Sequence, residues 1–379
     1  MDNYNKTSQT YNSPNNSSSF RAEEVSNKRA NIEIDEELER MLAAQKTRIK
    51  VIGCGGGGNN TINRIAEVGI KGVETIAINT DAQDLLYTNC DKKLLIGREL
   101  THGIGAGSNP KIGEEAAKEN EADLKKLIDG SDMIFITCGL GGGTGTGSAP
   151  FVAQLAKKMG ILSVGIVTMP FTMEGSHRHE NALIGLEKME QSISTLIVIP
   201  NEKLLELAPH LPLQTAFKVA DEILTNAVKG IAELVTKAGL VNLDFADVKA
   251  IMMNGGVSLI GMGESDTQQR AIDAVEKALN NPLLGVDVSN ASGALVNIIG
   301  GSDLSLDEAK TIIEYVGKKL GEDAKLIWGA QISEDMDKSI RVLLIITGVK
   351  SQQILGQEKP KEVQARESME EELGIEFYE

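Results

Sequence analysis

Three glycine-rich segments, placed between apolar runs and helical patterns, constrain the fold of this chain most. They read "GCGGGG" (53–58), "GIGAGSNP" (103–110) and "GLGGGTGTGSAP" (139–150). A glycine inside regular structure costs roughly 0.5–1 kcal/mol relative to alanine. Such density therefore indicates backbone that another group must approach closely. The first and third segments directly follow the apolar runs "RIKVIGC" and "MIFITCG", so they are predicted to be loops at the ends of strands.

The apolar runs alternate with helical patterns in the first half of the chain. Five runs, "RIKVIGC", "VETIAINT", "MIFITCG", "SVGIVTMP" and "TLIVIP", are β-branched and apolar on both faces. Strands of a parallel sheet covered by helices have this pattern, which predicts a doubly wound α/β domain. A long helical pattern follows at about 215–237. The remaining order, β-α-β-α-β-β, predicts a smaller α+β domain with a mixed four-stranded sheet.

The composition of the two ends differs from that of the centre. The first 30 residues are polar and rich in Asn and Ser, which is typical of disorder, and the tail after 350 is rich in Gln, Glu and Lys. The predicted organisation is a disordered extension (1–30), a short amphipathic helix (31–46), a nucleotide-binding domain (47–214), a central helix (215–238), a second domain (239–350) and a flexible tail (351–379).

Charge and cysteine usage limit the function classes. The net charge of −16 argues against a nucleic-acid-binding surface, because such surfaces are normally basic. The three cysteines are far apart in sequence, so neither a disulfide framework nor a zinc site is expected. The sequence shows no signal-peptide pattern and no run of 18 apolar residues, so we expect a cytoplasmic protein without direct membrane insertion.

The glycine loops suit phosphate binding, because backbone N–H groups at a helix N-terminus attract anions. The first loop satisfies G-x-G-x-x-G, and Asp81 ends the second strand, which is the pattern of an NAD-dependent Rossmann oxidoreductase. A dehydrogenase needs one phosphate loop, however. Three loops on one sheet edge, with the hydroxyls of Thr144 and Thr146, favour a nucleoside triphosphate. Glycines used only for tight strand–helix packing remain an alternative.

Several motifs resemble those of a known family. "GGGTGTG" at 141–147 is similar to the signature of the tubulin/FtsZ superfamily, and "NTDAQ", "PFTMEG", "IPNEKLLE" and "NLDFADVK" match FtsZ cell-division GTPases in the same order. The resemblance covers roughly 47–350, and the two ends resemble the archaeal branch. It implies the tubulin/FtsZ fold, binding of GTP and GDP, and Mg²⁺ held mainly through the nucleotide phosphates, with no metal site built from side chains alone.

The resemblance also implies a role for individual residues at the nucleotide. The phosphates and nucleoside would lie against Gly56, Gly57, Gly58, Asn59, Asn60, Gly143, Thr144, Gly145, Thr146 and Gly147. The γ-phosphate and Mg²⁺ would be surrounded by Asp81, Ala82, Ala106, Gly107 and Asn109. Glu174 would hold the ribose and Arg178 would reach a phosphate. The guanine base would be recognised by Asn201, Phe217 and Asp221, because a carboxylate accepts guanine's two adjacent donors.

The candidate catalytic residues are Asn242, Asp244 and Asp247 in "GLVNLDFADVK". An Asp at a helix start is usually a cap worth about 1 kcal/mol, and that interpretation stays open for Asp244. Asp244 and Asp247, three residues apart on a helix, project on one face. In the family this loop enters the nucleotide pocket of the next subunit, where its acids polarise water, so the resemblance implies hydrolysis that depends on assembly.

The implied partners are copies of the chain itself, joined head to tail into filaments of the cytokinetic ring. Ile375, Phe377 and Tyr378 form an apolar cluster at the end of the tail, which is either a frayed terminus or a motif that docks on a SepF-like membrane tether. The protein would then concentrate at the division site beneath the membrane. A tubulin-like cytoskeletal role other than division remains an alternative.

Overall fold

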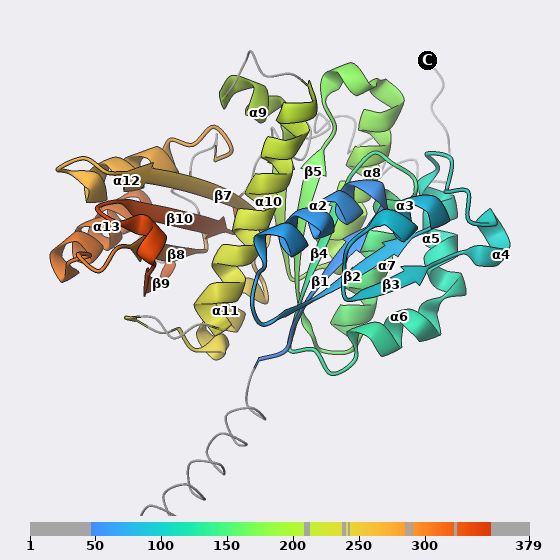
Figure 1. Ribbon diagram of the computed structural model, residues 1–379, viewed down its shortest axis with the longest axis horizontal. Coiled ribbons are helices and arrows are strands. Elements are labelled where there is room, and N and C mark those ends of the chain that lie inside the picture. The colour runs from blue at the N-terminus through green and yellow to red at the C-terminus, as the bar shows by residue number, and fades with distance from the viewer. Residues whose placement is uncertain are drawn as a thin grey trace, which may run out of the picture. The chain divides into compact units, whose positions relative to one another are not determined.

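The computed structural model of the protein describes residues 47–207, 213–236, 240–241, 243–284, 288, 291–321 and 324–349. These residues belong to one compact unit that begins at Thr47 (Figure 1). The expectations for 1–30, 31–46 and 351–379, including the tail cluster, lie outside the described residues. None of the described helices is both long and apolar enough to cross a membrane.

Ten strands form one sheet in the order β3-β2-β1-β4-β5-β6-β7-β10-β8-β9. Their bounds are β1 Ile49–Cys54, β2 Val73–Asn79, β3 Lys92–Leu95, β4 Met133–Gly139, β5 Leu162–Met169, β6 Thr195–Pro200, β7 Gly256–Ser265, β8 Gly293–Gly300, β9 Lys325–Ile332 and β10 Ile340–Thr347. Neighbouring strands from β3 to β6 are parallel, which confirms the doubly wound α/β half.

The other four strands form the predicted mixed sheet. β10 is antiparallel to both β7 and β8, whereas β8 and β9 are parallel. The two halves of the sheet are joined where Thr195–Ile197 of β6 pairs with Gly256–Ser258 of β7. The sequence did not predict this junction, because two segments so far apart along the chain carry no local signal for their pairing.

Helices cover both faces of the sheet. Their bounds are α2 Gly55–Val68, α3 Ala82–Tyr87, α4 Arg98–Thr101, α5 Pro110–Glu119, α6 Glu121–Ile128, α7 Thr144–Lys158, η1 Thr172–Glu174, α8 Ser176–Ser192, α9 Asn201–Leu207, α10 Leu213–Thr236, α11 Phe245–Met252, α12 Arg270–Leu279, α13 Leu306–Lys319 and η2 Glu334–Met336. One core lies under α5–α8, α12 and α13 and a second under α2, α10 and α11, with residues of β1 contributing alternately to each.

The long helix α10 agrees closely with the predicted central helix. Its 24 residues span about 36 Å at the usual rise per residue. It contributes Ala227, Val228 and Ile231 to the second core, which also contains residues of both sheet halves, such as Val51 and Leu343. Figure 1 shows α10 running between the two halves, with α9 near its first turns and α11 near its last. The helix therefore separates two regions of the surface.

Candidate active site

At the carboxyl edge of the parallel sheet, α2, α7 and α8 begin with neither a side-chain cap nor an acid in the first turn. The residues preceding these helices are Cys54, Gly143 and Gly175. By contrast, Asp81 caps α3 and Asn109 caps α5. Uncapped first-turn N–H groups together with the positive end of the helix dipole form an anion-binding site.

The glycines of 139–147 have two different physical reasons. A Cβ at Gly147 would overlap the carbonyl oxygen of Pro110, and one at Gly145 would lie 2.8 Å from the carbonyl oxygen of Cys54. These glycines let α7 pack against α5 and against the end of β1. A Cβ at Gly142 would meet nothing within 4 Å, so packing does not explain this glycine. Gly107, in the neighbouring loop, also has open space, but its φ of 55° already favours glycine. The open backbone at Gly142 is therefore free for a ligand.

The first glycine loop is tied to the second strand through an acid that the sequence analysis missed. Asp84 Oδ2 accepts hydrogen bonds from Asn59 Nδ2 at 3.0 Å and from Asn79 Nδ2 at 2.6 Å. Asn59 is fully buried, and its Oδ1 has no hydrogen-bond partner among the described residues. In "NTDAQD" nothing distinguishes Asp84 from an ordinary acid in a first helical turn, so spacing alone could not reveal it.

The 103–110 loop is held against the end of β2. The Ala82 N–H donates to Gly103 O at 2.9 Å, and the Gly105 N–H donates to Thr80 O at 3.2 Å. Asp81 Oδ1 accepts from the Gln83 and Asp84 N–H groups as the cap of α3. The structure thus brings Asp81, Ala82 and this loop together, as the sequence predicts. It also gives Asp81 a capping role that the sequence analysis did not assign.

The two threonines of the third loop are held by the protein itself. Thr144 Oγ1 lies 2.6 Å from Thr80 Oγ1, and Thr146 Oγ1 accepts from the Gly141 N–H at 2.9 Å. Both side chains are buried. Because a hydroxyl carries one donor and two acceptor positions, Thr146 keeps its proton for another acceptor. The oxygen atoms of the two predicted hydroxyl donors are therefore held in place by the protein itself.

Glu174 and Arg178, predicted to bind ribose and phosphate, contact each other. Arg178 Nη1 lies 3.1 Å from Glu174 Oε2, and Glu174 Oε1 accepts from the Phe171 N–H at 2.8 Å. The side chain of Arg178 covers Gly141, where a Cβ would lie 2.7 Å from Arg178 Cγ. Half of the Arg178 side chain is exposed, so the guanidinium remains accessible at the edge of the glycine loop.

Two of the three residues predicted to recognise the base, Phe217 and Asp221, line a cleft at the start of α10, whereas Asn201 begins α9. A cleft of about 710 Å³ is lined by Asn60, Asn63, Arg64, Glu67, Thr215, Phe217, Lys218, Val219, Asp221 and Glu222. The ring of Phe217 packs edge-on against Phe171, with centroids 5.3 Å apart. Burial raises the pKa of Asp221 to about 6. Asn201 is buried, and its Oδ1 lacks a hydrogen-bond partner within the described part of the chain.

The predicted catalytic acids lie after the other end of α10. Asp244 caps α11 by accepting from the Ala246 N–H at 3.4 Å, so the capping interpretation of this residue holds in the structure. Asp244 and Asp247 are both exposed, whereas Asn242 lies outside the described residues. Across the described ranges, no group of three or more His, Cys, Asp or Glu side chains is placed to hold a metal ion.

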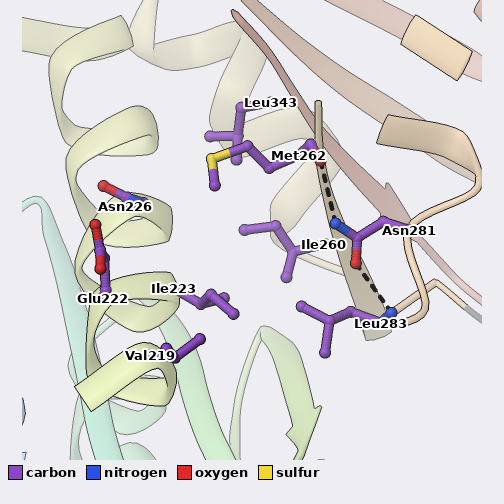
Figure 2. Close-up of a pocket in the computed structure, with 9 residues that line it drawn as sticks. All are labelled: Val219, Glu222, Ile223, Asn226, Ile260, Met262, Asn281, Leu283 and Leu343. Carbon is purple, nitrogen blue, oxygen red and sulfur yellow. Dashed lines mark hydrogen bonds between the residues drawn. The ribbon is translucent and has the colours of Figure 1, made fainter. Parts of the chain in front are cut away.

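A second, apolar cleft of about 230 Å³ lies between α10 and the second half of the sheet. Figure 2 shows Val219 and Ile223 of α10 facing Ile260, Leu283 and Leu343 across it. Its wall is fixed by Asn281, whose Nδ2 donates to Met262 O at 3.1 Å and whose Oδ1 accepts from the Leu283 N–H at 3.0 Å. The cleft contains none of the predicted site residues.

Two family models match this chain. The GTPase domain of the tubulin/FtsZ family matches residues 48–209, and the C-terminal domain of the FtsZ family matches residues 256–350. The chain is 58% identical to "Cell division protein FtsZ 1" of Thermococcus kodakarensis over 331 residues, which cover 87% of this chain and 88% of the relative.

Solved structures give the same result. The structure "FtsZ dimer, empty (M. jannaschii)" superposes with a TM-score of 0.80 at 58% identity, covering 84% of this chain and 93% of that one. "CetZ1 from Haloferax volcanii - GDP bound monomer" has a TM-score of 0.71 at 21% identity over 84% of this chain and 98% of that one, which shows likeness of fold alone. The strand order β3-β2-β1-β4-β5-β6 also suits a Rossmann oxidoreductase. The family matches are what favours a guanine nucleotide over NAD.

Proposed function

Because the chain belongs to the tubulin/FtsZ family and is an FtsZ-type GTPase of cell division, we propose that it associates with copies of itself and that GTP is hydrolysed at the junction of two copies. One copy supplies the nucleotide pocket at the carboxyl edge of its parallel sheet. The next copy supplies Asn242, Asp244 and Asp247. A contact of this heterologous kind repeats into a filament when its rotation does not close.

The observation that carries this proposal is the position of the two sets of residues on α10. Phe217 and Asp221 belong to its first turns, and Asp244 follows its last turn, so about 23–29 Å of helix separates the two sets at the usual rise per residue. In the proposed arrangement, the acids of one copy lie at the end of α10 opposite to its own base-binding residues. A second copy placed head to tail would bring them together.

The pocket residues fit a guanine nucleotide. We assign the phosphates to the open first turns of α2 and α7, at Gly56, Gly57, Gly58, Asn59, Asn60, Gly143, Thr144, Gly145, Thr146 and Gly147. Asp81, Ala82, Ala106, Gly107 and Asn109 would surround the terminal phosphate, with Glu174 and Arg178 at the ribose and phosphate. Asn201, Phe217 and Asp221 would hold guanine. The unpartnered Oδ1 atoms of Asn59 and Asn201 support a polar ligand, because buried polar atoms are rarely left without one.

Hydrolysis in this arrangement rests on positioning. Asp244 and Asp247 would orient the attacking water and accept its proton, while backbone N–H groups of the glycine loops hold the terminal phosphate. Mg²⁺, bound mainly through the nucleotide phosphates, would supply positive charge that offsets the phosphates and the acids. Phosphoryl transfer needs little beyond such placement and charge stabilisation.

The cellular setting is part of the same proposal. The filaments would lie in the cytoplasm beneath the membrane at the division site, held by a SepF-like tether that binds Ile375, Phe377 and Tyr378 of the tail. The 58% identity to a cell-division protein favours this role over another cytoskeletal one.

Mixing two defective variants tests the shared site. Asp244→Ala keeps the pocket but lacks the acid, whereas Asp221→Ala keeps the acid but loses guanine recognition. Each variant alone is expected to hydrolyse GTP at least about 100-fold more slowly than wild type, because each junction lacks one half. The equimolar mixture is expected to recover a substantial share of wild-type turnover, measured as phosphate release.

The control for this experiment is a mixture of Asp244→Ala with Asp247→Ala, which places both defects in the same half. That mixture has no junction with a complete set of acids and should remain inactive. Recovery of activity there would contradict the assignment of both acids to the same half of the junction. No recovery in the first mixture, despite co-sedimentation of both variants, would show that the pocket and the acids must belong to the same copy.

A further inference from the structure

Thr61 connects the phosphate end of the candidate pocket with its base end. It lies in the second turn of α2, and its side chain is fully buried. Its Oγ1 lies 3.2 Å from Gly57 O and 3.2 Å from Asp221 Oδ1. Asp221 belongs to α10, so this hydroxyl joins two helices that are remote in sequence. None of the motifs weighed in the sequence points to Thr61.

The helix itself does not need the hydroxyl. In an α-helix the carbonyl of Gly57 already accepts the backbone N–H of Thr61, four residues later. A buried hydroxyl costs free energy unless it makes a hydrogen bond, so an apolar side chain of the same shape would be the default at a fully buried position. Gly57 O and Asp221 Oδ1 lie at the same distance from the Thr61 hydroxyl, which has a single proton. The carboxylate is the charged acceptor of the two and so forms the stronger hydrogen bond.

We propose that Thr61 is a positioning residue for base recognition: its hydroxyl fixes the orientation and the charge of the Asp221 carboxylate, and so sets the guanine preference of the site. This inference rests on the proposed assignment of Asp221 to guanine. An ionised carboxylate accepts from both the N1–H and the exocyclic amine of guanine. A protonated carboxyl presents a donor of its own and loses one of these contacts.

Opposing effects act on the pKa of Asp221 and so on its charge near neutral pH. Burial raises its pKa to about 6, while the hydrogen bond from Thr61 and then the charge of Arg64 act in the opposite direction. Without the hydroxyl the pKa moves further upward. Guanine affinity is therefore present above the pKa of Asp221 and lost as the pH falls through it, and removal of the Thr61 hydroxyl shifts that loss to higher pH.

Other charged side chains line the same cleft and are common to all variants. They are Arg64 and Glu67 of α2, which pair at 2.9 Å, and Lys218 and Glu222 of α10. Because none of them is changed, they contribute equally to wild type and variants. A difference between the two pH profiles then belongs to the Thr61–Asp221 pair.

The experiment measures the Kd of the full-length protein for GDP by calorimetry at several values between about pH 5.5 and 8. Thr61→Val removes only the hydroxyl from a nearly unchanged shape, and Thr61→Ser keeps it. At the highest pH, the Kd of Thr61→Val for GDP is expected to exceed that of wild type by less than about tenfold. As the pH falls, the affinity of Thr61→Val is expected to be lost with a midpoint about one pH unit above the midpoint of wild type. Thr61→Ser should follow wild type.

If Thr61 had only a structural role, Thr61→Val would weaken GDP binding by the same factor at every pH and would not shift the midpoint. That result would overturn the inference. If Thr61→Val has a lower melting temperature than wild type, the same measurement is made with Thr61→Ala, which also lacks the hydroxyl. Asp221→Asn should keep only the pH dependence that comes from the terminal phosphate of GDP, whose pKa is about 6, and Thr61→Val added to it should shift nothing further. Failure of the proposed function is distinguishable: wild type would then bind ADP as tightly as GDP at the highest pH, whatever Thr61 does.

Discussion

At the scale of single residues, Gly142 and Gly147 differ although both belong to one glycine-rich segment. Gly147 is buried where α7 crosses α5, and Gly142 faces open space. Density of glycine in the sequence predicts that something approaches the backbone. It does not distinguish a neighbouring part of the chain from a ligand, because either can approach the backbone closely only where a Cβ is absent.

Alanine at these two positions separates packing from binding. Gly147→Ala is expected to destabilise the nucleotide-free protein by about 1–3 kcal/mol, because the new methyl overlaps the backbone of α5. Gly142→Ala should leave the melting temperature of the nucleotide-free protein unchanged and reduce the rise in melting temperature that GDP produces. Thermal unfolding with and without GDP measures both. An equal loss of stability in the two variants would contradict the assignment of open space at Gly142.

At the scale of elements, Arg270 at the start of α12 connects this helix to the start of α13 in the second half of the molecule. Its guanidinium donates to Glu308 Oε1 at 2.6 Å and Oε2 at 3.1 Å, and to Asp303 Oδ2 at 2.7 Å. Glu308 also accepts from Ser305 as part of the capping box of α13. The Arg270 side chain is 11% exposed, that of Glu308 24% and that of Asp303 44%, so solvent screens the contact with Glu308 less than the contact with Asp303.

Arg270→Met is expected to lower the free energy of unfolding by about 1.5–3 kcal/mol near pH 7, since it leaves the partly buried carboxylate of Glu308 without its partner and removes a hydrogen bond to the exposed Asp303. The hydrogen bonds from Arg270 lower the pKa of Glu308 to about 2. The stabilisation is therefore present above the unfolded pKa of about 4.3 and is lost as the pH falls toward 2. Urea unfolding at several pH values should show the gap to wild type closing over this range.

The exposed pair Lys310–Glu314, 3.7 Å apart on α13, supplies the control. Lys310→Met should change stability by less than about 0.5 kcal/mol at any pH. If Arg270→Met changed stability as little as Lys310→Met, the hydrogen bonds of Arg270 with Glu308 and Asp303 would contribute nothing to stability.

Most elements follow from local pattern, and the exceptions have physical reasons. Apolar runs predict β1, β2 and the strands from β4 to β10, but β3 (Lys92–Leu95) was missed because it is a short edge strand that begins with two exposed lysines. The loops of the candidate site could be predicted together, because carboxyl ends of parallel strands share one edge. Contacts such as Asn59–Asp84 and Thr61–Asp221 could not, since they depend on the packing of separate elements.

At the scale of the whole molecule, two apolar side chains stand exposed on loops beside the candidate pocket. Ile104, in the 103–110 loop, is 84% exposed, and Met173, in η1, is 72% exposed. Large apolar side chains exposed next to a functional site are typical of a surface that another protein covers. In the proposed filament this surface faces the next copy.

Ile104→Asp is expected to raise the protein concentration needed for GTP-dependent sedimentation by at least about tenfold, because a charge would be buried at the junction. The Kd for GDP, measured at a dilution where the chain is monomeric, should stay within about twofold of wild type. Ile184→Asp introduces the same charge at a half-exposed position on α8, and should leave assembly unchanged. Equal effects of the two substitutions would contradict a junction at the 103–110 loop.

The length of α10 has a consequence for counting. If one end of each copy holds the nucleotide and the other end holds the acids, a row of n copies contains n − 1 complete catalytic centres. A pair of copies can then hydrolyse only one of its two bound GTP molecules, whereas a long row can hydrolyse nearly all of its bound GTP. The copy at one tip always retains intact GTP, so the row carries a chemical mark of its own growing or shrinking end.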